Sequence, residues 1–269
     1  MTNQSYNLNS IQEILSHLPL HNVEYFETIG STNDRAAEIA ANNNDLFSVV
    51  IADEQTKGRG RSGRSWFTPP GSALALSIVL PINANKNNSE IALVSGLGAL
   101  AVTNSINNKL NLDAKIKWPN DVLVSGEKVS GVLAEAHWVG DSLKAVILGI
   151  GVNIGKESIP PSETLTFPAN SLNNITGRKI KRLEILRDII QNGIALWPLV
   201  GSREFINTWE NGLAFSGESV KLISGKNIAI YGIIEGLADD GSLLLRLENG
   251  KLKNFQVGEI QLRPNIDKN

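Results

Sequence analysis

The sequence of 269 residues contains no cysteine, so disulfide bonds and thiolate metal sites are excluded and a reducing compartment is permitted. The three histidines, His17, His21 and His137, have no spacing typical of a metal site. No apolar run approaches the ~18 to 20 residues that span a bilayer, and the N-terminus lacks the basic start and apolar core of a signal peptide. We therefore expect a cytoplasmic protein with no membrane partner and no metal centre built from side chains.

An excess of positive charge is also lacking, because 25 lysines and arginines face 27 aspartates and glutamates, for a formal net charge of −2. A dedicated DNA-binding protein depends on many phosphate contacts from a basic face, so this balance argues against one. Hydrophobic residues make up 42% and charged residues 19%, as in folded rather than disordered chains. The chain therefore folds, and its positive charge is local.

The patterning predicts an α+β fold. Ser10 with Glu13 forms a capping box that should start a helix running through Leu18, and Ser31 should cap a second helix that ends at the asparagines of 42–44. Further expected elements are helices at 89–110, 181–200 and 202–212 and strands at 23–29, 47–53, 73–80, 114–118, 122–138 and 143–154, with hairpin turns at SGEK and VGDS. Several strands follow one another directly, so we expect a mixed, largely antiparallel sheet flanked by helices.

The pattern changes near residues 212–218, after which short strands alternate with the turns SGKN, ADDG and ENG. About fifty residues of this kind predict a small β-barrel. We therefore expect a ligand-binding domain over residues 1–214 and a barrel over 215–269. A strand already begins near Val23, which leaves no room ahead of it for a helix-turn-helix.

The local positive charge lies in GRGRSGRSW, residues 58–66, where Arg59, Arg61 and Arg64 alternate with small residues. Glycine lets backbone amides converge on an anion, and arginine binds carboxylate or phosphate bidentately. The P-loop spacing GxxxxGK followed by Ser or Thr does not occur, and no apolar helix follows Gly63 as a dinucleotide-binding turn requires. The stretch is a candidate anion site that closes on its ligand, but a solvated loop or a nonspecific nucleic-acid contact has the same composition.

A second motif, KWPND, covers residues 117–121. Alternation places Lys117 on the opposite face of a strand from Ile116 and Trp118, and Pro119 should end that strand. Lys117 therefore stands at a strand end, either as a solubilising charge on an exposed strand or as a cation placed in a site.

Three further features have both a functional and an ordinary explanation. STN at 31–33 opens a helix, where Ser31 can act as the cap and also read the polar edge of a ligand. Gln55 can donate to and accept from an amide-like ligand, or lie in an exposed turn. Gly149 and Gly151 lie inside the apolar strand of GIGVN, which indicates close approach by a ligand or tight helix packing.

The order STN, Gln55, GRGRSGRSW, KWPND, SGVLAE and LGIGVNI resembles the biotin protein ligases across nearly the whole chain. The resemblance implies a class II aminoacyl-tRNA-synthetase-like domain of the biotin and lipoate ligase type, followed by an SH3-like β-barrel. It also implies synthesis of biotinyl-5′-AMP from biotin and ATP with Mg²⁺. Biotin would then pass to a lysine of a biotin carboxyl carrier protein, such as that of acetyl-CoA carboxylase.

The resemblance assigns roles to the motif residues, with Lys117, Arg59 and Arg61 as the catalytic cations. The residues that it implies for biotin binding are Ser31, Thr32, Asn33, Gln55, Arg59, Gly60, Arg61, Lys117 and Gly131. Those that it implies for ATP binding are Arg59, Arg61, Trp66, Lys117 and Asn153, although Trp66 could equally belong to the core. Magnesium would be held mainly by phosphates and water. We expect a monofunctional ligase without a DNA partner, and a homodimer is compatible with the sequence.

Two alternatives stay open. A lipoate ligase or octanoyl transferase has a related fold and its own strand-borne lysine, but the sequence lacks the GGG stretch associated with those enzymes. A noncatalytic RNA-binding module could use the arginine-glycine loop. It would need aromatic side chains interleaved for base stacking, and only Trp66 and Phe67 lie near the loop.

Overall fold

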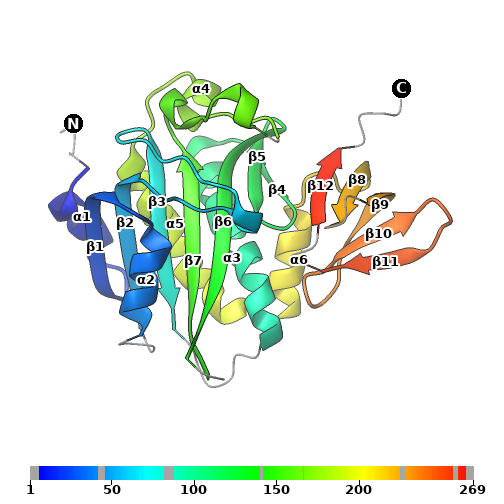
Figure 1. Ribbon diagram of the computed structural model, residues 1–269, viewed down its shortest axis with the longest axis horizontal. Helices are drawn as coiled ribbons and strands as arrows, with labels where there is room; N and C mark the ends of the chain where they lie inside the picture. The colour runs from blue at the N-terminus through cyan, green and yellow to red at the C-terminus, as the bar shows by residue number, and fades with distance from the viewer. Residues whose placement is uncertain are drawn as a thin grey trace.

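The computed structural model describes residues 6–41, 46–81, 88–139, 142–165, 167–224, 228–256 and 260–264. Within these residues the chain forms a seven-stranded mixed sheet and a five-stranded antiparallel sheet, which lie side by side in Figure 1. In spatial order the strands of the larger sheet are β1 (Leu20–Ile29), β2 (Phe47–Gln55), β3 (Ala73–Leu80), β7 (Ser142–Asn153), β6 (Glu127–Val139), β5 (Asp121–Val124) and β4 (Ala114–Lys117). Only β1 and β2, among the described pairs, run parallel.

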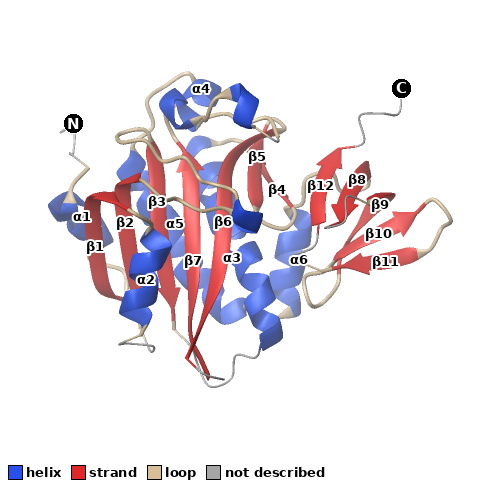
Figure 2. Ribbon diagram, in the orientation of Figure 1, coloured by secondary structure: helices blue, strands red, loops and turns tan. Residues whose placement is uncertain are grey.

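Helices cover both faces of the larger sheet, as Figure 2 shows. The helices are α1 (Leu8–Leu15), α2 (Thr32–Ala40), α3 (Asn88–Leu110), α4 (Leu172–Thr176), α5 (Arg182–Leu196) and α6 (Arg203–Asn211). One face packs on α3 and α5 and forms the main core, whereas α2 lies on the opposite face over a smaller apolar cluster. None of the helices in the described part of the chain is both long and apolar enough to cross a membrane.

Strand β3 illustrates why both faces must be covered, because all eight of its residues are buried. Leu74, Leu76 and Ile78 belong to the main core, and Val79 belongs to the cluster beneath α2. Side chains alternate between the faces of a strand, so Ser77 points to the same side as Val79, toward α2. A lone serine in an apolar strand therefore lies on the α2 side, where the pocket is found.

One predicted helix cap is wrong, and the other is right in position but makes no side-chain hydrogen bond. Helix α1 begins at Leu8 and ends at Leu15, because the side chain of Asn7 accepts the Ser10 amide at 3.0 Å and caps the helix earlier than the predicted capping box. Ser31 does precede α2, but its side chain makes no capping hydrogen bond. Gln55, at the end of the neighbouring β2, instead accepts the Thr32 amide at 2.9 Å.

The smaller sheet follows the larger one in sequence and confirms the predicted small β domain. Its described strands are, in spatial order, β11 (Leu252–Phe255), β10 (Leu243–Leu247), β9 (Ala229–Leu237), β8 (Ser219–Ser224) and β12 (Ile260–Pro264). The small domain contacts the KWPND motif of the larger one. Trp118 Nε1 of that motif donates to the carbonyl of Gly241, which lies between β9 and β10, at 3.0 Å. The predicted α+β class with an SH3-like C-terminal part is confirmed, whereas the boundary at 214/215 stays a prediction.

Candidate functional site

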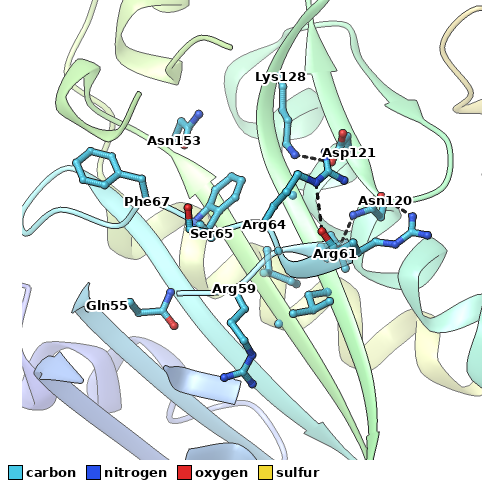
Figure 3. A pocket seen from close by; sticks show the side chains of 18 of the residues that line it. Gln55, Arg59, Arg61, Arg64, Ser65, Phe67, Asn120, Asp121, Lys128 and Asn153 are labelled. Atoms are coloured by element: carbon cyan, nitrogen blue, oxygen red, sulfur yellow. Dashed lines mark hydrogen bonds and ion pairs between the residues drawn. The ribbon is translucent and has the colours of Figure 1, made fainter. Parts of the chain in front are cut away.

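A pocket of about 340 Å³ lies over the face of the larger sheet that carries α2, a volume suited to a small molecule. Its lining includes every residue that the sequence analysis selected for ligand binding, namely Ser31, Thr32, Asn33, Gln55, Arg59, Gly60, Arg61, Trp66, Lys117, Gly131 and Asn153. It also includes Asn120, Asp121 and Lys128, to which the sequence analysis gave no binding role. Figure 3 shows several of these side chains converging from separate segments.

At the floor of the pocket no side chains project from the sheet where glycines of the described strands β6 and β7 lie next to each other. The register pairs Gly131 with Gly151, and paired residues share one face of the sheet. The Trp66 ring occupies the space above them, since a Cβ on Gly151 would lie 2.1 Å from Trp66 Cε2. A Cβ on Gly149 would likewise lie 2.3 Å from Asn33 Oδ1. The glycines of GIGVN thus serve close approach of side chains in the pocket, not helix packing at these two positions.

One end of the pocket is a polar corner at the start of α2. Gln55 Oε1 lies 2.9 Å from the Thr32 amide and 3.1 Å from its hydroxyl. Ser77 Oγ lies 2.7 Å from Thr32 Oγ1 and 2.6 Å from Asn33 Oδ1. Ser31 is buried and lines the pocket without a capping bond. The corner therefore offers neutral donors and acceptors whose positions are fixed by neighbouring strands.

The glycine-arginine stretch forms a short hairpin across the pocket. Gly58 accepts from the Trp66 amide at 2.9 Å, and the Gly60 amide donates to the Arg64 carbonyl at 2.6 Å. A Cβ on Gly58 would lie 2.4 Å from the Trp66 carbonyl oxygen, and Gly63 has φ +73°, so both positions favour glycine. The amides of Gly60 and Trp66 thus donate within the hairpin, and the expectation that amides of this loop converge on an anion stays a prediction for the others.

Two arginines fasten the hairpin on opposite sides. Arg59 pairs with Asp34 at 2.7 Å and with Glu135 at 3.3 Å, and Arg61 Nη1 donates to Asn120 Oδ1 at 3.0 Å. Partial burial lowers the pKa of Arg59, but the two carboxylates outweigh it and raise the pKa above its ordinary value. Burial lowers the pKa of Arg61, whose guanidinium still stays charged at neutral pH.

Beyond the hairpin lies a buried charge cluster formed by Lys117, Asp121 and Lys128. The Asp121 carboxylate receives Lys117 Nζ at 2.8 Å on one oxygen and Lys128 Nζ at 2.6 Å on the other. Burial raises the pKa of Asp121, but the two ammonium groups outweigh it and hold the pKa well below its usual range. Lys117 is 5% exposed, so its interpretation as a solubilising surface charge is wrong.

The sequence analysis missed Lys128 because a bulge reverses the alternation along β6. The register between β5 and β6 shifts between Val122 and Leu123, so Lys128 pairs with Leu123 and shares the face of Asp121. Its Nζ lies 5.4 Å from the centre of the Trp66 ring and beside the floor glycine Gly131. Strict alternation from Gly131 would have turned this lysine away from the pocket, and its position as the last residue of the SGEK turn was the available sequence signal.

The pocket offers little to a metal ion. Of the described residues that line it, only Asp121 carries a carboxylate, and both of its oxygens pair with lysines. Across the described ranges, no three histidine or acidic side chains gather as a metal site would require. The charge of the lining is mainly positive, with Arg59, Arg61, Arg64, Lys117 and Lys128 against that one carboxylate.

The chain matches known proteins over both of its parts. The sequence model of the "Biotin/lipoate A/B protein ligase family" matches residues 25–153, and that of the "Biotin protein ligase C terminal domain" matches residues 215–263. A biotin–[acetyl-CoA-carboxylase] ligase of Paracoccus denitrificans is 32% identical over 228 residues, which cover 82% of this chain and 92% of that protein. The bifunctional ligase/repressor BirA of Bacillus spizizenii is 31% identical over 242 residues, which cover 88% and 73%.

A solved structure resembles the whole arrangement. The biotin protein ligase from Aquifex aeolicus, in complex with biotin and ATP, superposes with a TM-score of 0.76 at 31% sequence identity. The superposition covers 91% of this chain and 100% of the other. The likeness therefore extends over the sheet that carries the pocket and over the smaller β domain.

Proposed function

Because the chain belongs to the biotin protein ligase family, we propose that it activates biotin with ATP and transfers it to a lysine of a biotin carboxyl carrier protein. In the first step a biotin carboxylate oxygen attacks the α-phosphorus of ATP, which forms biotinyl-5′-AMP and releases pyrophosphate. In the second step the neutral amine of the acceptor lysine attacks the biotinyl carbonyl. AMP leaves, and the amide nitrogen loses its proton to solvent.

The observation that carries this proposal is that the pocket has two chemically different ends. The corner of Ser31, Thr32, Asn33 and Gln55 presents neutral hydrogen-bonding groups, and the other end presents arginine and lysine. Biotin has the same division, with a neutral ureido ring at one end and a carboxylate at the other. Two anions, the carboxylate and the α-phosphate, repel each other, so a catalyst must hold them together with fixed cations.

We assign the cation that meets these anions to Lys128 rather than to Lys117. Both lysine side chains line the pocket, but that of Lys117 is only 7% exposed, whereas that of Lys128 is 21% exposed and lies over the pocket floor. Lys128 can therefore reach a ligand while Lys117 fixes the carboxylate that orients it. Arg61, on the hairpin, supplies a second positive charge from above.

The remaining residues have supporting roles in this proposal. Gly131 lets the Trp66 ring and the Lys128 side chain lie close to the pocket floor beside biotin, and the Trp66 ring shelters the adenylate from water, which would hydrolyse it. Asn153 donates to the Asn170 carbonyl at 3.2 Å and lies at the ATP side of the pocket. Arg59 and Gly60 belong to the hairpin. Because Arg59 pairs with two carboxylates, its main role in this proposal is to hold the hairpin in place.

Magnesium fits this pocket only as a companion of the nucleotide. Since the Asp121 oxygens already pair with lysines, the chain provides no cage of carboxylates. An ion bound by the triphosphate and water needs none. When bound, it neutralises phosphate charge, and the side chains named above do the positioning.

Labelled pyrophosphate exchange tests the proposed function. The purified protein with ATP and Mg²⁺ should exchange label into ATP when biotin is added, and it should biotinylate a carrier domain once that domain is present. Lipoate or octanoate in place of biotin is the informative control, since the matched family model includes lipoate ligases. Exchange that depends on lipoate and not on biotin would refute the proposal.

A further inference from the structure

The carboxylate of Glu135 joins the two parts of the site. Its Oε2 accepts from Asn33 Nδ2, in the polar corner, and from Arg59 Nη2, in the hairpin, at 3.3 Å. We propose that Glu135 is a positioning residue that couples the corner to the hairpin, so that each holds the other in its ligand-binding arrangement. The proposal rests on the proposed function for the nature of the ligand, but the coupling itself is a property of the protein.

Toward the hairpin, Glu135 acts through Arg59. That arginine stands next to the hairpin's first cross-strand bond, between the Gly58 carbonyl and the Trp66 amide. Its guanidinium meets one carboxylate from α2, Asp34, and one from β6, Glu135. Arg59 is therefore tied to two elements that are themselves fixed, and this end of the hairpin stays close to the corner.

Toward the corner, Glu135 sets which way the Asn33 amide faces. An ionised carboxylate only accepts hydrogen bonds, so the nitrogen of Asn33 must turn to it. The amide oxygen then lies 2.6 Å from Ser77 Oγ and against Gly149, where no Cβ stands in the way. If the acceptor at position 135 is lost, the amide can reverse and present the wrong groups to the ligand.

Loss of the contacts that Glu135 makes with Arg59 and Asn33 should have different consequences from a general loss of folding stability. The side chains of Arg59 and Glu135 are 39% and 37% exposed, so their pairing adds little to global folding. Its loss should loosen the hairpin and weaken ligand binding together. A residue that matters only for folding would lower the unfolding temperature and leave the hairpin and the ligand unaffected.

The test compares Glu135→Ala and Glu135→Gln with Glu24→Ala. Glu24 holds Arg35 through two hydrogen bonds of 2.7 and 2.9 Å outside the pocket, so it is a matched control for a lost arginine pair. The measurements are trypsin cleavage after Arg59, Arg61 and Arg64 without ligand, the biotin dissociation constant by calorimetry, and the dissociation rate of biotinyl-5′-AMP.

For Glu135→Ala we expect cleavage, the biotin dissociation constant and adenylate release all to rise about three- to tenfold, since a charged hydrogen bond is lost at a half-exposed position. The glutamine of Glu135→Gln can still accept a hydrogen bond but no longer fixes the orientation of the Asn33 amide. Its three measured values should therefore lie between those of Glu135→Ala and those of the wild type. Glu24→Ala should match the wild type.

Wild-type cleavage and wild-type release in Glu135→Ala would overturn the coupling. The same result in Glu135→Gln would do so if the alanine variant does not fold. A wild-type protein that binds no biotin would instead refute the proposed function, and the cleavage comparison would still test the coupling.

Discussion

Two clusters of three charges flank the pocket, and the signs of the charges in one are opposite to those in the other. In one, the Asp121 carboxylate lies between two lysines, and in the other, the Arg59 guanidinium lies between two carboxylates. The Asp121 side chain is 8% exposed, whereas Asp34 in the second cluster is 57% exposed. The same three-charge arrangement thus occurs once in the interior and once at the surface.

The difference in burial assigns different tasks to the two clusters. Breaking a buried pair leaves an uncompensated charge in a poorly solvated place, so we expect the interior cluster to stay paired while the protein is folded. Exposed pairs are screened and easily replaced by water, so the surface cluster can open and close. Fixed cations suit the reacting anions, and an adjustable pair suits the hairpin that must admit a ligand.

The largest effect should come from breaking the interior cluster at its centre. Asp121→Ala removes the partner of two lysines and should lower the free energy of unfolding by about 3–5 kcal/mol. Urea unfolding followed by tryptophan fluorescence measures it, with Asp34→Ala as the control from the surface cluster. Equal losses for the two variants would contradict the contrast in burial.

The same carboxylate gives the interior cluster a pH signature. The pKa of Asp121 is lower in the folded than in the unfolded protein, so its stabilisation is complete above the unfolded pKa, about 3.9, and is lost as pH falls below it. The free energy of unfolding should therefore drop more between pH 5 and pH 3 in the wild type than in Asp121→Asn. Parallel curves for the two proteins would show that Asp121 is not the group involved.

The next largest effect should separate the two lysines of the interior cluster. Lys128→Met removes a cation that faces the pocket and should slow biotin-dependent pyrophosphate exchange by about 100- to 1,000-fold. Lys117→Met should mainly lower stability, by about 1–3 kcal/mol, because Asp121 keeps one of its two partners. Exchange at saturating biotin, with unfolding measured in parallel, tests both. The reverse pattern would return the role of holding the α-phosphate to Lys117.

The contrast between these lysines also shows how far the sequence could lead. Alternation correctly placed Lys117 at the end of a strand, and the motif order correctly indicated the biotin protein ligase family. Periodicity could not find Lys128, because a bulge in β6 turns it to the other face. Bulges depend on how two strands pair, and neither strand alone carries that information.

Contacts that are distant in sequence explain the other misses. The Thr32 amide at the start of α2 donates to Gln55, which lies on a neighbouring strand. The sequence around Ser31 carries no sign of this contact, so it indicated that Ser31 alone would cap the helix. Glu135 belongs to an apolar strand and meets partners 76 and 102 residues away in the chain. Local pattern gave most elements correctly because burial on both faces sets alternation, but side-chain partners follow from the tertiary fold.

A smaller effect should come from the side of the hairpin that faces the interior cluster. Arg61→Ala removes the bond from Nη1 to Asn120 Oδ1, and biotinyl-5′-AMP should leave about tenfold faster. Release of radiolabelled adenylate on a filter measures the rate. Arg203→Ala, which breaks the exposed pair between Arg203 on α6 and Asp239, is the control. An unchanged release rate in Arg61→Ala would mean that the hairpin is held from the Arg59 side alone.

The smallest effect should come from the outermost charge of the surface cluster. Asp34→Asn weakens the pair with Arg59, but Asp34 is more than half exposed, so the free energy of unfolding should change by less than about 1 kcal/mol. Added salt screens exposed pairs and spares buried ones, so raising salt should bring wild-type trypsin cleavage of the hairpin toward that of Asp34→Asn. Cleavage rates at low and high salt, with Asp121→Asn as the interior counterpart, measure this. If salt leaves the wild-type rate unchanged, the surface cluster is as rigid as the interior one, and the hairpin must admit its ligand without releasing Arg59.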